Sequence, residues 1–305
     1  MKEVLKKPLV VGILALVACA LWGSAFPGIK IGYKWLQIED TGSRILFAGY
    51  RFFLAGMITF IVGSILEKKI LRLDKTAVPY VMGIGMLQTT LQYVFFYIGM
   101  ANITGVKGSV INSANAFVSI ITAHFLLKNE KMSWQKGIGC LIGFVGVIVI
   151  NYVPGEVLGT GFSFWGEGMI VLCTMIYGIS SVLMKMISRR GSAMAITSYQ
   201  LQFGGVLLIV IGWLSGGKIH HFTMKSLLLL AYLAVLSAVA FSIWTSLLKY
   251  NPVSRVTIFG FSIPVFGVIL SAIFLNEQVI SWKNLVALAF VSGGIIIVNL
   301  VPSKS

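Results

Sequence analysis

The sequence predicts an all-α integral membrane protein of about ten transmembrane helices, arranged as two inverted five-helix repeats. Three observations predict this fold: an apolar composition, evenly spaced apolar runs, and an internal repeat. Of the 305 residues, 57% are hydrophobic and 11% are charged, and mean hydropathy is +0.93. A soluble domain has about a quarter of its residues charged. The apolar runs lack the alternating polar pattern of lipid-facing barrel strands, so helices are expected to cross the bilayer.

Apolar runs of about 20 residues, bounded by charged residues, Pro or Gly, mark the predicted spans. They are 8–31, 44–66, 77–100, 104–127, 134–152, 163–187, 193–214, 226–248, 254–275 and 281–301. The shortest links lie at Asn102–Thr104 and Asn251–Pro252. No segment between spans is long enough for a soluble domain. The predicted domains are therefore the two halves, 1–152 and 153–305.

Basic residues gather in alternate loops, which predicts a plasma-membrane protein with both termini in the cytoplasm. On this topology sixteen Lys and Arg residues face the cytoplasm, and seven face the exterior. The net charge of +15 therefore comes from short loops and does not indicate nucleic-acid binding. The three cysteines, Cys19, Cys140 and Cys173, lie inside apolar runs, so no disulfide is expected.

The two halves of the chain resemble each other at an offset of roughly 147–149 residues. Leu127-Lys128-Asn129-Glu130 with Ser133-Trp134 matches Leu275-Asn276-Glu277 with Ser281-Trp282. Asn151 and Asn299 close the next apolar run in each copy. Tyr50-Arg51 and Gly56 likewise match Tyr199-Gln200 and Gly205.

An odd number of spans per copy makes the second copy enter the membrane from the other side. The charges agree with this inversion, because the loop around Glu130 holds Lys128, Lys131 and Lys136, whereas the loop around Glu277 holds only Lys283. Two inverted halves can open a central site to each side of the membrane in turn, which is typical of secondary transporters. A duplication retained only for packing is the alternative.

Several motifs together resemble the EamA family of the drug/metabolite transporter superfamily. They are Trp22-Gly23-Ser24-Ala25-Phe26, Tyr50-Arg51-Phe52 and the two Asn-Glu plus Ser-Trp junctions. The resemblance covers essentially the whole chain. It implies ten helices, cytoplasmic termini and a central cavity between two four-helix bundles, with the fifth and tenth helices peripheral. It also implies export or exchange of amino acids, sugars, nucleotide derivatives or other small metabolites.

Polar side chains at membrane depth are the strongest indicators of a substrate site, because they are costly unless they face a cavity or another helix. Gln88 and Gln92 lie one helical turn apart, and Asn112, Asn115 and Ser119 share one helix face. The predicted substrate-binding residues are Trp22, Ser24, Arg51, Gln88, Gln92, Tyr93, Asn112, Asn115, Tyr177, Ser181, Tyr199, Gln202, Trp244 and Ser262. Hydrogen bonding between neighbouring helices is the alternative role for each of them.

Two clusters of helix-breaking residues accompany these polar positions. Gly23, Pro27 and Gly28 form the first cluster, and Gly260, Pro264 and Gly267 form the second. Both predict helix breaks that expose backbone groups to a ligand or act as hinges. Kinked packing without a functional role is the alternative.

Arg51 is the one basic residue assigned to neither side of the membrane, because it lies well inside the second predicted span. One interpretation is a side chain that snorkels to the headgroups or pairs structurally. The other is a cation that faces the cavity and binds a substrate carboxylate or phosphate.

The nine acidic residues all fall at loops or helix ends. A proton-coupled exporter of cationic drugs is expected to carry a deep carboxylate, so the hypothesis is facilitated diffusion or exchange of a zwitterionic or anionic metabolite.

The sequence thus favours a secondary transporter, an exporter, facilitator or exchanger, for a small polar metabolite such as an amino acid. The alternatives are a lipid or headgroup flippase, a multidrug exporter, a structural subunit, and a membrane-embedded enzyme. An enzyme needs a nucleophile and base, a metal constellation or paired carboxylates, and none is recognisable. No cofactor motif or metal site is expected, since His220-His221 lacks a third ligand. The expected partners are the lipid bilayer and a small-molecule substrate; no oligomeric state is assigned.

Overall fold

The computed structural model describes residues 3–128, 130–151, 162–275 and 282–299. All regular structure in these residues is helical, which confirms the predicted class. The elements are η1 (Val4–Lys6), α1 (Pro8–Trp35), α2 (Thr41–Leu66), α3 (Val78–Ile84), η2 (Gly85–Leu91), α4 (Gln92–Asn102), α5 (Gly105–Ser113), α6 (Asn115–Leu126), α7 (Trp134–Asn151), η3 (Phe164–Gly168), α8 (Met169–Ser188), α9 (Ala193–Leu214), α10 (Met224–Tyr250), α11 (Val253–Thr257), η4 (Ile258–Phe261), α12 (Ser262–Leu275) and α13 (Trp282–Asn299).

Eight helical segments of the described chain are long and apolar enough to cross a membrane. They are Pro8–Trp35, Thr41–Leu66, Val78–Asn102, Lys107–Leu126, Phe164–Ser188, Ala193–Leu214, Met224–Tyr250 and Val253–Leu275. Each coincides with a predicted span to within a few residues. The other two predicted spans coincide with α7 and α13, helices of 18 residues each. The count of ten crossings stays a prediction, and the motif residues Asn129, Asn276, Glu277 and Ser281 lie outside the described residues.

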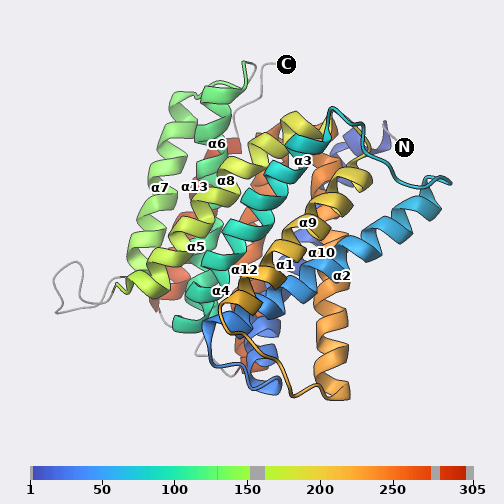
Figure 1. Ribbon diagram of the computed structural model, residues 1–305. Helices are drawn as coiled ribbons and strands as arrows, with labels where there is room; N and C mark the ends of the chain where they lie inside the picture. The colour runs from blue at the N-terminus through green and yellow to red at the C-terminus, as the bar shows by residue number, and fades with distance from the viewer. Residues whose placement is uncertain (1–2, 129, 152–161, 276–281, 300–305) are drawn as a thin grey trace.

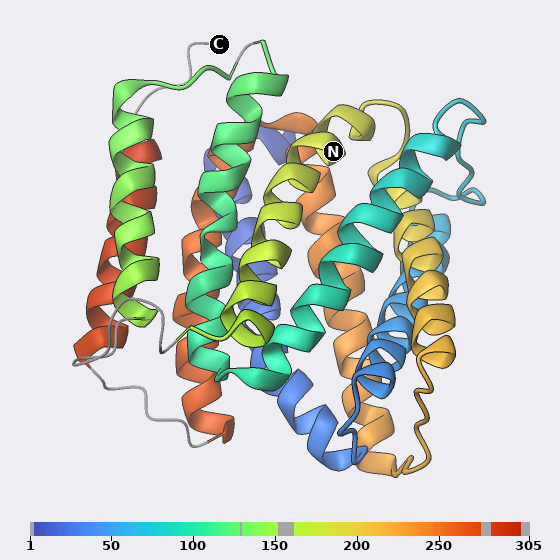
Figure 2. The same cartoon turned by 60° about the vertical axis from the view of Figure 1, so that its left-hand side comes forward.

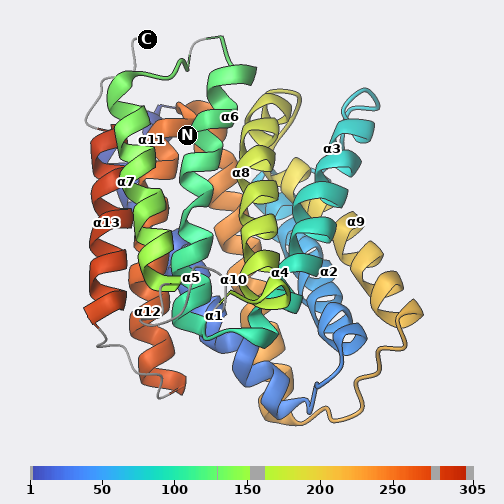
Figure 3. The same cartoon turned by 90° about the vertical axis from the view of Figure 1, so that its left-hand side faces the viewer.

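The helices form a bundle with two helix pairs at its edges. α7 and α13 lie side by side at one edge, and α2 and α9 lie at the opposite edge (Figures 1, 2 and 3). Between these edges α1 packs against α10 and α12, and α8 packs against α4 and α6. The middle of the bundle, where α1, α4 and α8 approach one another, holds the candidate site.

Glycines bring α2 and α9 into backbone contact. A Cβ atom added at Gly56 would lie 2.6 Å from the backbone nitrogen of Gln202, and one at Gly205 would lie 2.4 Å from that of Phe53. Gly49 is likewise close to Ile209. Residue numbers rise along α2 as they fall along α9, so the two helices are antiparallel. Small residues permit this close approach, which drives helix association in membranes.

The helix break expected near Gly23, Pro27 and Gly28 is wrong, because α1 runs unbroken from Pro8 to Trp35. Gly23 serves packing instead: a Cβ atom there would lie 2.5 Å from Cβ of Phe266. Around Gly260 the chain does change, passing from α11 through the 3-10 turn η4 into α12.

Two further interruptions were not expected from the sequence. η2 is a π-helical segment between α3 and α4, and a turn at Ala114 separates α5 from α6. Both interruptions lie next to predicted site residues and change the directions in which those side chains point.

Asp40 caps the N-terminus of α2 and thereby fixes where the helix begins. Its carboxylate accepts a hydrogen bond from the backbone nitrogen of Ser43 at 2.7 Å. Partial burial raises the pKa of the Asp40 carboxyl, but the hydrogen bonds from Ser43 and the charge of Arg44 outweigh this and lower the pKa below its usual value. The cap therefore stabilises the fold above the unfolded-state pKa, and this contribution is lost as pH falls through the folded-state pKa.

We expect Asp40→Ala to destabilise the protein by about 1 kcal/mol, the usual value of an N-cap. Glu39→Ala is the matched control, because Glu39 is exposed and caps no helix. Thermal unfolding of the purified protein at neutral pH measures both. Equal melting temperatures for the two variants would contradict the capping role, and the difference between them should shrink at acidic pH.

Candidate functional site

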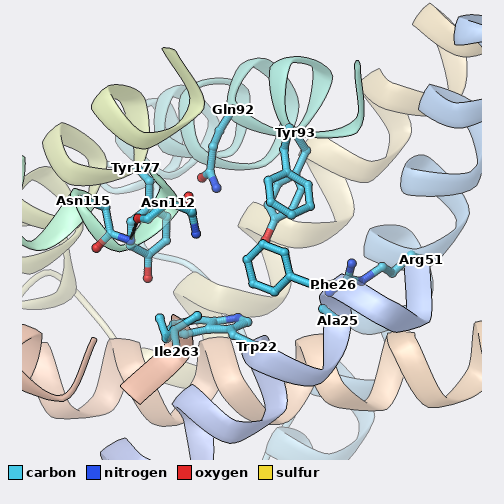
Figure 4. Close-up of a pocket in the computed structure, with 11 residues that line it drawn as sticks. Trp22, Ala25, Phe26, Arg51, Gln92, Tyr93, Asn112, Asn115, Tyr177 and Ile263 are labelled. Atoms are coloured by element: carbon cyan, nitrogen blue, oxygen red, sulfur yellow. Dashed lines mark hydrogen bonds between the residues drawn. The ribbon is translucent and has the colours of Figure 1, made fainter. Parts of the chain in front are cut away.

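A cavity lies in the middle of the bundle, enclosed by residues from both halves of the sequence. Its lining residues are Trp22, Ala25, Phe26, Arg51, Gln92, Tyr93, Phe96, Asn112, Asn115, Tyr177 and Ile263. Figure 4 shows Trp22 on one side of the space and Gln92 and Tyr93 across from it, with Arg51 at one end and Asn112, Asn115 and Tyr177 at the other. The free space is about 30 Å³, enough for a water molecule or two.

Arg51 supplies a buried positive charge to this cavity. Its side chain is 1% exposed, which excludes the interpretation that it snorkels to the headgroups. Nε donates to Oγ of Ser237 at 2.8 Å, Nη1 donates to Oη of Tyr97 at 3.3 Å, and the guanidinium lies 4.9 Å from the Phe52 ring centroid. No carboxylate among the described residues pairs with it. Arginine has five N–H donors, so most of its donor capacity is still available to a ligand.

Amide and hydroxyl groups lie at the other end of the cavity. Oδ1 of Asn112 accepts from Oγ1 of Thr174 at 3.5 Å, and Nδ2 of Asn115 donates to the backbone oxygen of Asn112 at 2.6 Å. Oε1 of Gln92 and the hydroxyl of Tyr177 are buried without a partner. Buried polar atoms are nearly always hydrogen-bonded, so these two atoms are suited to contact a polar ligand.

Trp22 forms the centre of an aromatic wall. Its ring centroid lies 6.0 Å from that of Tyr177, 5.5 Å from Phe241 and 5.0 Å from Trp244, all in edge-on contacts. The indole nitrogens of Trp22 and Trp244 are both buried without an acceptor. The wall therefore offers an aromatic face to a ligand together with an unpaired donor at Trp22.

Half of the predicted site residues line this cavity: Trp22, Arg51, Gln92, Tyr93, Asn112, Asn115 and Tyr177. Their part in substrate binding stays a prediction. Trp244 does not line the cavity but packs edge-on against Trp22. The other six residues hydrogen-bond within their own helix or to another segment, as described next.

Two of these six bond within their own helical segment, because Ser181 donates to the backbone of Tyr177 and Ser262 to that of Phe259. Three connect different segments: Tyr199 donates to the backbone of Leu71, Gln202 to that of Gly56, and Gln88 accepts from Gln200. Ser24 shares a hydrogen bond of 2.6 Å with Tyr232 and also donates to the backbone of Leu21.

The cavity also contains residues that the sequence analysis did not select. Ala25, Phe26, Phe96 and Ile263 line it, yet buried apolar side chains carry no pattern that separates a cavity wall from a packed core. Ser237 holds Arg51 from α10, and no local sequence signal connects the two. Among the described residues, no group of three or more His, Cys, Asp or Glu side chains could hold a metal ion.

A wider vestibule opens at the end of the bundle opposite the N-terminus. Its volume is about 630 Å³, and its lining includes Lys30, Lys34, Arg44, Gln37 and Glu39. Tyr33 lines this vestibule and donates to the backbone oxygen of Tyr97, whose hydroxyl accepts from Arg51 at the cavity.

A polar, cation-bearing cavity within a bundle of helices that are long and apolar enough to cross a membrane is typical of a membrane transport protein. The model of the EamA-like transporter family matches residues 10–152 and 164–300, so the chain belongs to this family. The name of the family and that of the first relative below describe transporters, not enzymes.

Three curated relatives illustrate the match. The chain is 25% identical to the uncharacterized transporter YetK of Bacillus subtilis, over 83% of this chain and 77% of that protein. It is 28% identical to an uncharacterized transporter of Archaeoglobus fulgidus, over 87% and 90%. It is 24% identical to a probable amino-acid metabolite efflux pump of Escherichia coli, over 92% of both chains. One solved crystal structure has the same fold, with a TM-score of 0.72 and 16% identity over 95% of this chain and 96% of that chain.

Proposed function

We propose that this protein is a secondary transporter that carries a small metabolite with a carboxylate group, an amino acid, across the plasma membrane by alternating access. It works as an exporter, facilitator or exchanger. The observation that carries the proposal is the buried guanidinium of Arg51 at the central cavity, which has no carboxylate partner among the described residues.

A buried charge without a counter-charge is costly, so its presence needs a reason. A substrate carboxylate would supply the missing counter-charge and accept the remaining N–H donors of Arg51. Away from Arg51, the carbonyl oxygen of Gln92, across from Trp22, and the hydroxyl of Tyr177, at the other end of the cavity, are free to accept from an ammonium group. The face of Trp22 would add a cation–π contact. This distribution suits a zwitterion better than a simple cation.

Two halves of opposite orientation are one arrangement that supports alternating access. The helix contacts support such a repeat. In the predicted repeat α1 corresponds to η3–α8, and the segment from α5 to α6 corresponds to that from α11 to α12. α1 runs parallel to α12, with Gly12 near Phe259 and Gly23 near Phe266.

The corresponding pair, α8 and the segment from α5 to α6, is also parallel. Asn112 contacts Thr174, and Ser119 contacts Gly178. The pairs α2 with α9 and α7 with α13 each join one element to its own counterpart, as expected around a two-fold axis. The family model also matches two segments that divide at the predicted boundary.

Two other transport functions share these helices. A multidrug exporter for cations fits poorly, because the cavity lining contains Arg51 and no carboxylate. A flippase would place a lipid phosphate against Arg51, so Arg51 alone does not distinguish a flippase from a metabolite transporter. Phospholipid scrambling is therefore measured in the same liposomes as amino-acid uptake. The name of the Escherichia coli relative, an amino-acid metabolite efflux pump, further supports the amino-acid class.

The proposal is tested with purified protein in liposomes and a panel of radiolabelled amino acids. We expect saturable uptake of at least one zwitterionic or anionic amino acid, and counterflow of it, without an imposed proton gradient. Strict dependence on a proton gradient would overturn facilitated diffusion or exchange. Transport of apolar cations with all amino acids inactive would overturn the substrate class. Scrambling of a fluorescent phospholipid in the same liposomes would indicate a flippase.

A further inference from the structure

A buried ion pair ties the two halves together at the N-terminal end of the bundle, the end where α1 begins. Nζ of Lys185, on α8, lies 3.4 Å from Oε1 of Glu130, and the two side chains are 10% and 9% exposed. Glu130 precedes α7 and belongs to the first half of the chain. Lys185 belongs to the second half. The pair therefore crosses the boundary between the halves.

The same two side chains also hold the junction between α10 and α11. Nζ of Lys185 donates to the backbone oxygen of Asn251. The Glu130 carboxylate accepts from the backbone nitrogens of Val253 at 3.1 Å and Ser254 at 3.4 Å. The Asn251 side chain in turn donates to the backbone of Leu5 at 2.9 Å, ahead of α1. One ion pair thus joins the α6–α7 link to α8, α10 and α11.

Unpaired polar atoms lie between this ion pair and the central cavity. Each of α8, α10 and α11 contributes one such atom: Oγ of Ser180, Nε1 of Trp244 and Oγ1 of Thr257. Ser180 lies between Tyr177, which lines the cavity, and Lys185 on the same helix. Buried polar atoms without a partner need an explanation. A passage that fills with water or substrate when the three elements separate would provide one.

Stability alone is a weak reason for a buried ion pair, because desolvation offsets much of its attraction, and a switch between states is a better-attested role. We propose that Glu130 and Lys185 form the gate at the N-terminal end of the transport pathway. Their contact keeps α8, α10 and α11 closed while the vestibule at the opposite end is open. Separation of the pair opens the passage past Ser180 and Thr257. This inference rests on the proposed alternating access.

The gate is tested by the reactivity of a cysteine placed inside the closed passage. Cys19, Cys140 and Cys173 are first replaced by alanine, and Ser180→Cys is then introduced at a fully buried position. A membrane-impermeant maleimide is applied from the N-terminal side. We expect Glu130→Gln to raise the labelling rate at least about tenfold, which corresponds to about 1.4 kcal/mol in the opening equilibrium.

Matched controls separate gating from general loosening. Glu3→Gln breaks the exposed Lys6–Glu3 ion pair at the same end, and Glu167→Gln breaks the Lys107–Glu167 ion pair, which involves η3 at the opposite end. Neither is expected to raise labelling from the N-terminal side. A second reporter, Ser198→Cys, lies buried at the α2–α9 contact and should stay unlabelled in every variant.

Unchanged labelling in Glu130→Gln would overturn the gate, as would equal labelling of both reporters. Glu130→Asp, which keeps the charge but shortens the reach, provides a milder variant if Glu130→Gln does not fold. It should give an intermediate rate, and wild-type labelling would also count against the gate. The assay needs no substrate, so its failure beside intact amino-acid uptake removes the gate alone. If labelling rises in Glu130→Gln but the wild-type protein takes up no amino acid, the proposed function is overturned and the gate is not.

Discussion

Replacing Arg51 by methionine is expected to lower kcat/KM for amino-acid transport by at least about thirtyfold. Truncating one partner of a buried, hydrogen-bonded charge pair costs about 2–5 kcal/mol, and each 1.4 kcal/mol is tenfold in affinity. Methionine is unbranched and flexible, so it can fill much of the same space. Uptake into liposomes over a range of substrate concentrations measures the loss.

The same change is not expected to lower thermal stability. In the absence of substrate Arg51 has no carboxylate partner in the part of the chain that the structure describes, so removing its charge also removes a desolvation cost. The lost hydrogen bonds to Ser237 and Tyr97 oppose this gain. A large loss of transport with a nearly constant melting temperature is the result that separates a substrate-binding role from a structural one.

Two companion variants sharpen this test. Arg51→Lys keeps the charge but cannot reproduce the planar set of donors that reaches Ser237 and Tyr97 together, so intermediate transport is expected. Arg72→Met removes an exposed arginine and should leave transport unchanged. Wild-type kcat/KM in Arg51→Met would contradict the assignment of Arg51 as the carboxylate-binding group.

The helices were predictable because hydropathy over about 20 residues is enough to mark a membrane-crossing segment. Their starts are marked by side chains that cap the first turn, such as Asp40 before α2, Ser192 before α9 and Thr223 before α10. These local signals do not depend on the rest of the fold. The described helices therefore agree closely with the expected spans.

The candidate site was only partly predictable, because side-chain direction depends on helix irregularities. Gln88 and Gln92 were expected to share one face, yet Gln88 bonds to Gln200 while Gln92 lines the cavity. Gln88 lies within the π-helical segment η2, which ends one residue before Gln92 and changes the rotation per residue. In the same way, the turn at Ala114 separates Asn112 from Ser119, which bonds to Gly178 instead.

The position of Arg51 depends on residues far away in the chain. The sequence left open whether its side chain reaches the headgroups or the cavity. Ser237 on α10 and Tyr97 on α4 hold it inward, and both are distant in sequence. Only the packing of these helices against α2 decides the direction.

Gly56 and Gly205 were matched as repeat partners in the sequence, and in the structure both lie at the α2–α9 contact. Alanine at either position would place Cβ within 2.6 Å of a backbone nitrogen of the opposite helix, where no flexible side chain can move aside. We expect Gly56→Ala and Gly205→Ala each to destabilise the protein by about 3 kcal/mol, the upper part of the usual range for overpacking.

Gly83→Ala is the matched control, because it makes the same chemical change in a helix where no atom of another described segment lies within 4 Å of the new Cβ. Alanine there should stabilise the protein by about 0.5–1 kcal/mol, since glycine is the poorer helix former. Tryptophan fluorescence during thermal unfolding in detergent measures all three variants. The inverted repeat predicts similar losses of stability for Gly56→Ala and Gly205→Ala. The two glycines are counterparts in the repeat, so they occupy equivalent places in the α2–α9 contact. A melting temperature of Gly205→Ala equal to that of Gly83→Ala would show that α2 and α9 do not pack backbone to backbone. The inverted repeat would then lose the antiparallel contact between α2 and α9 that supports it.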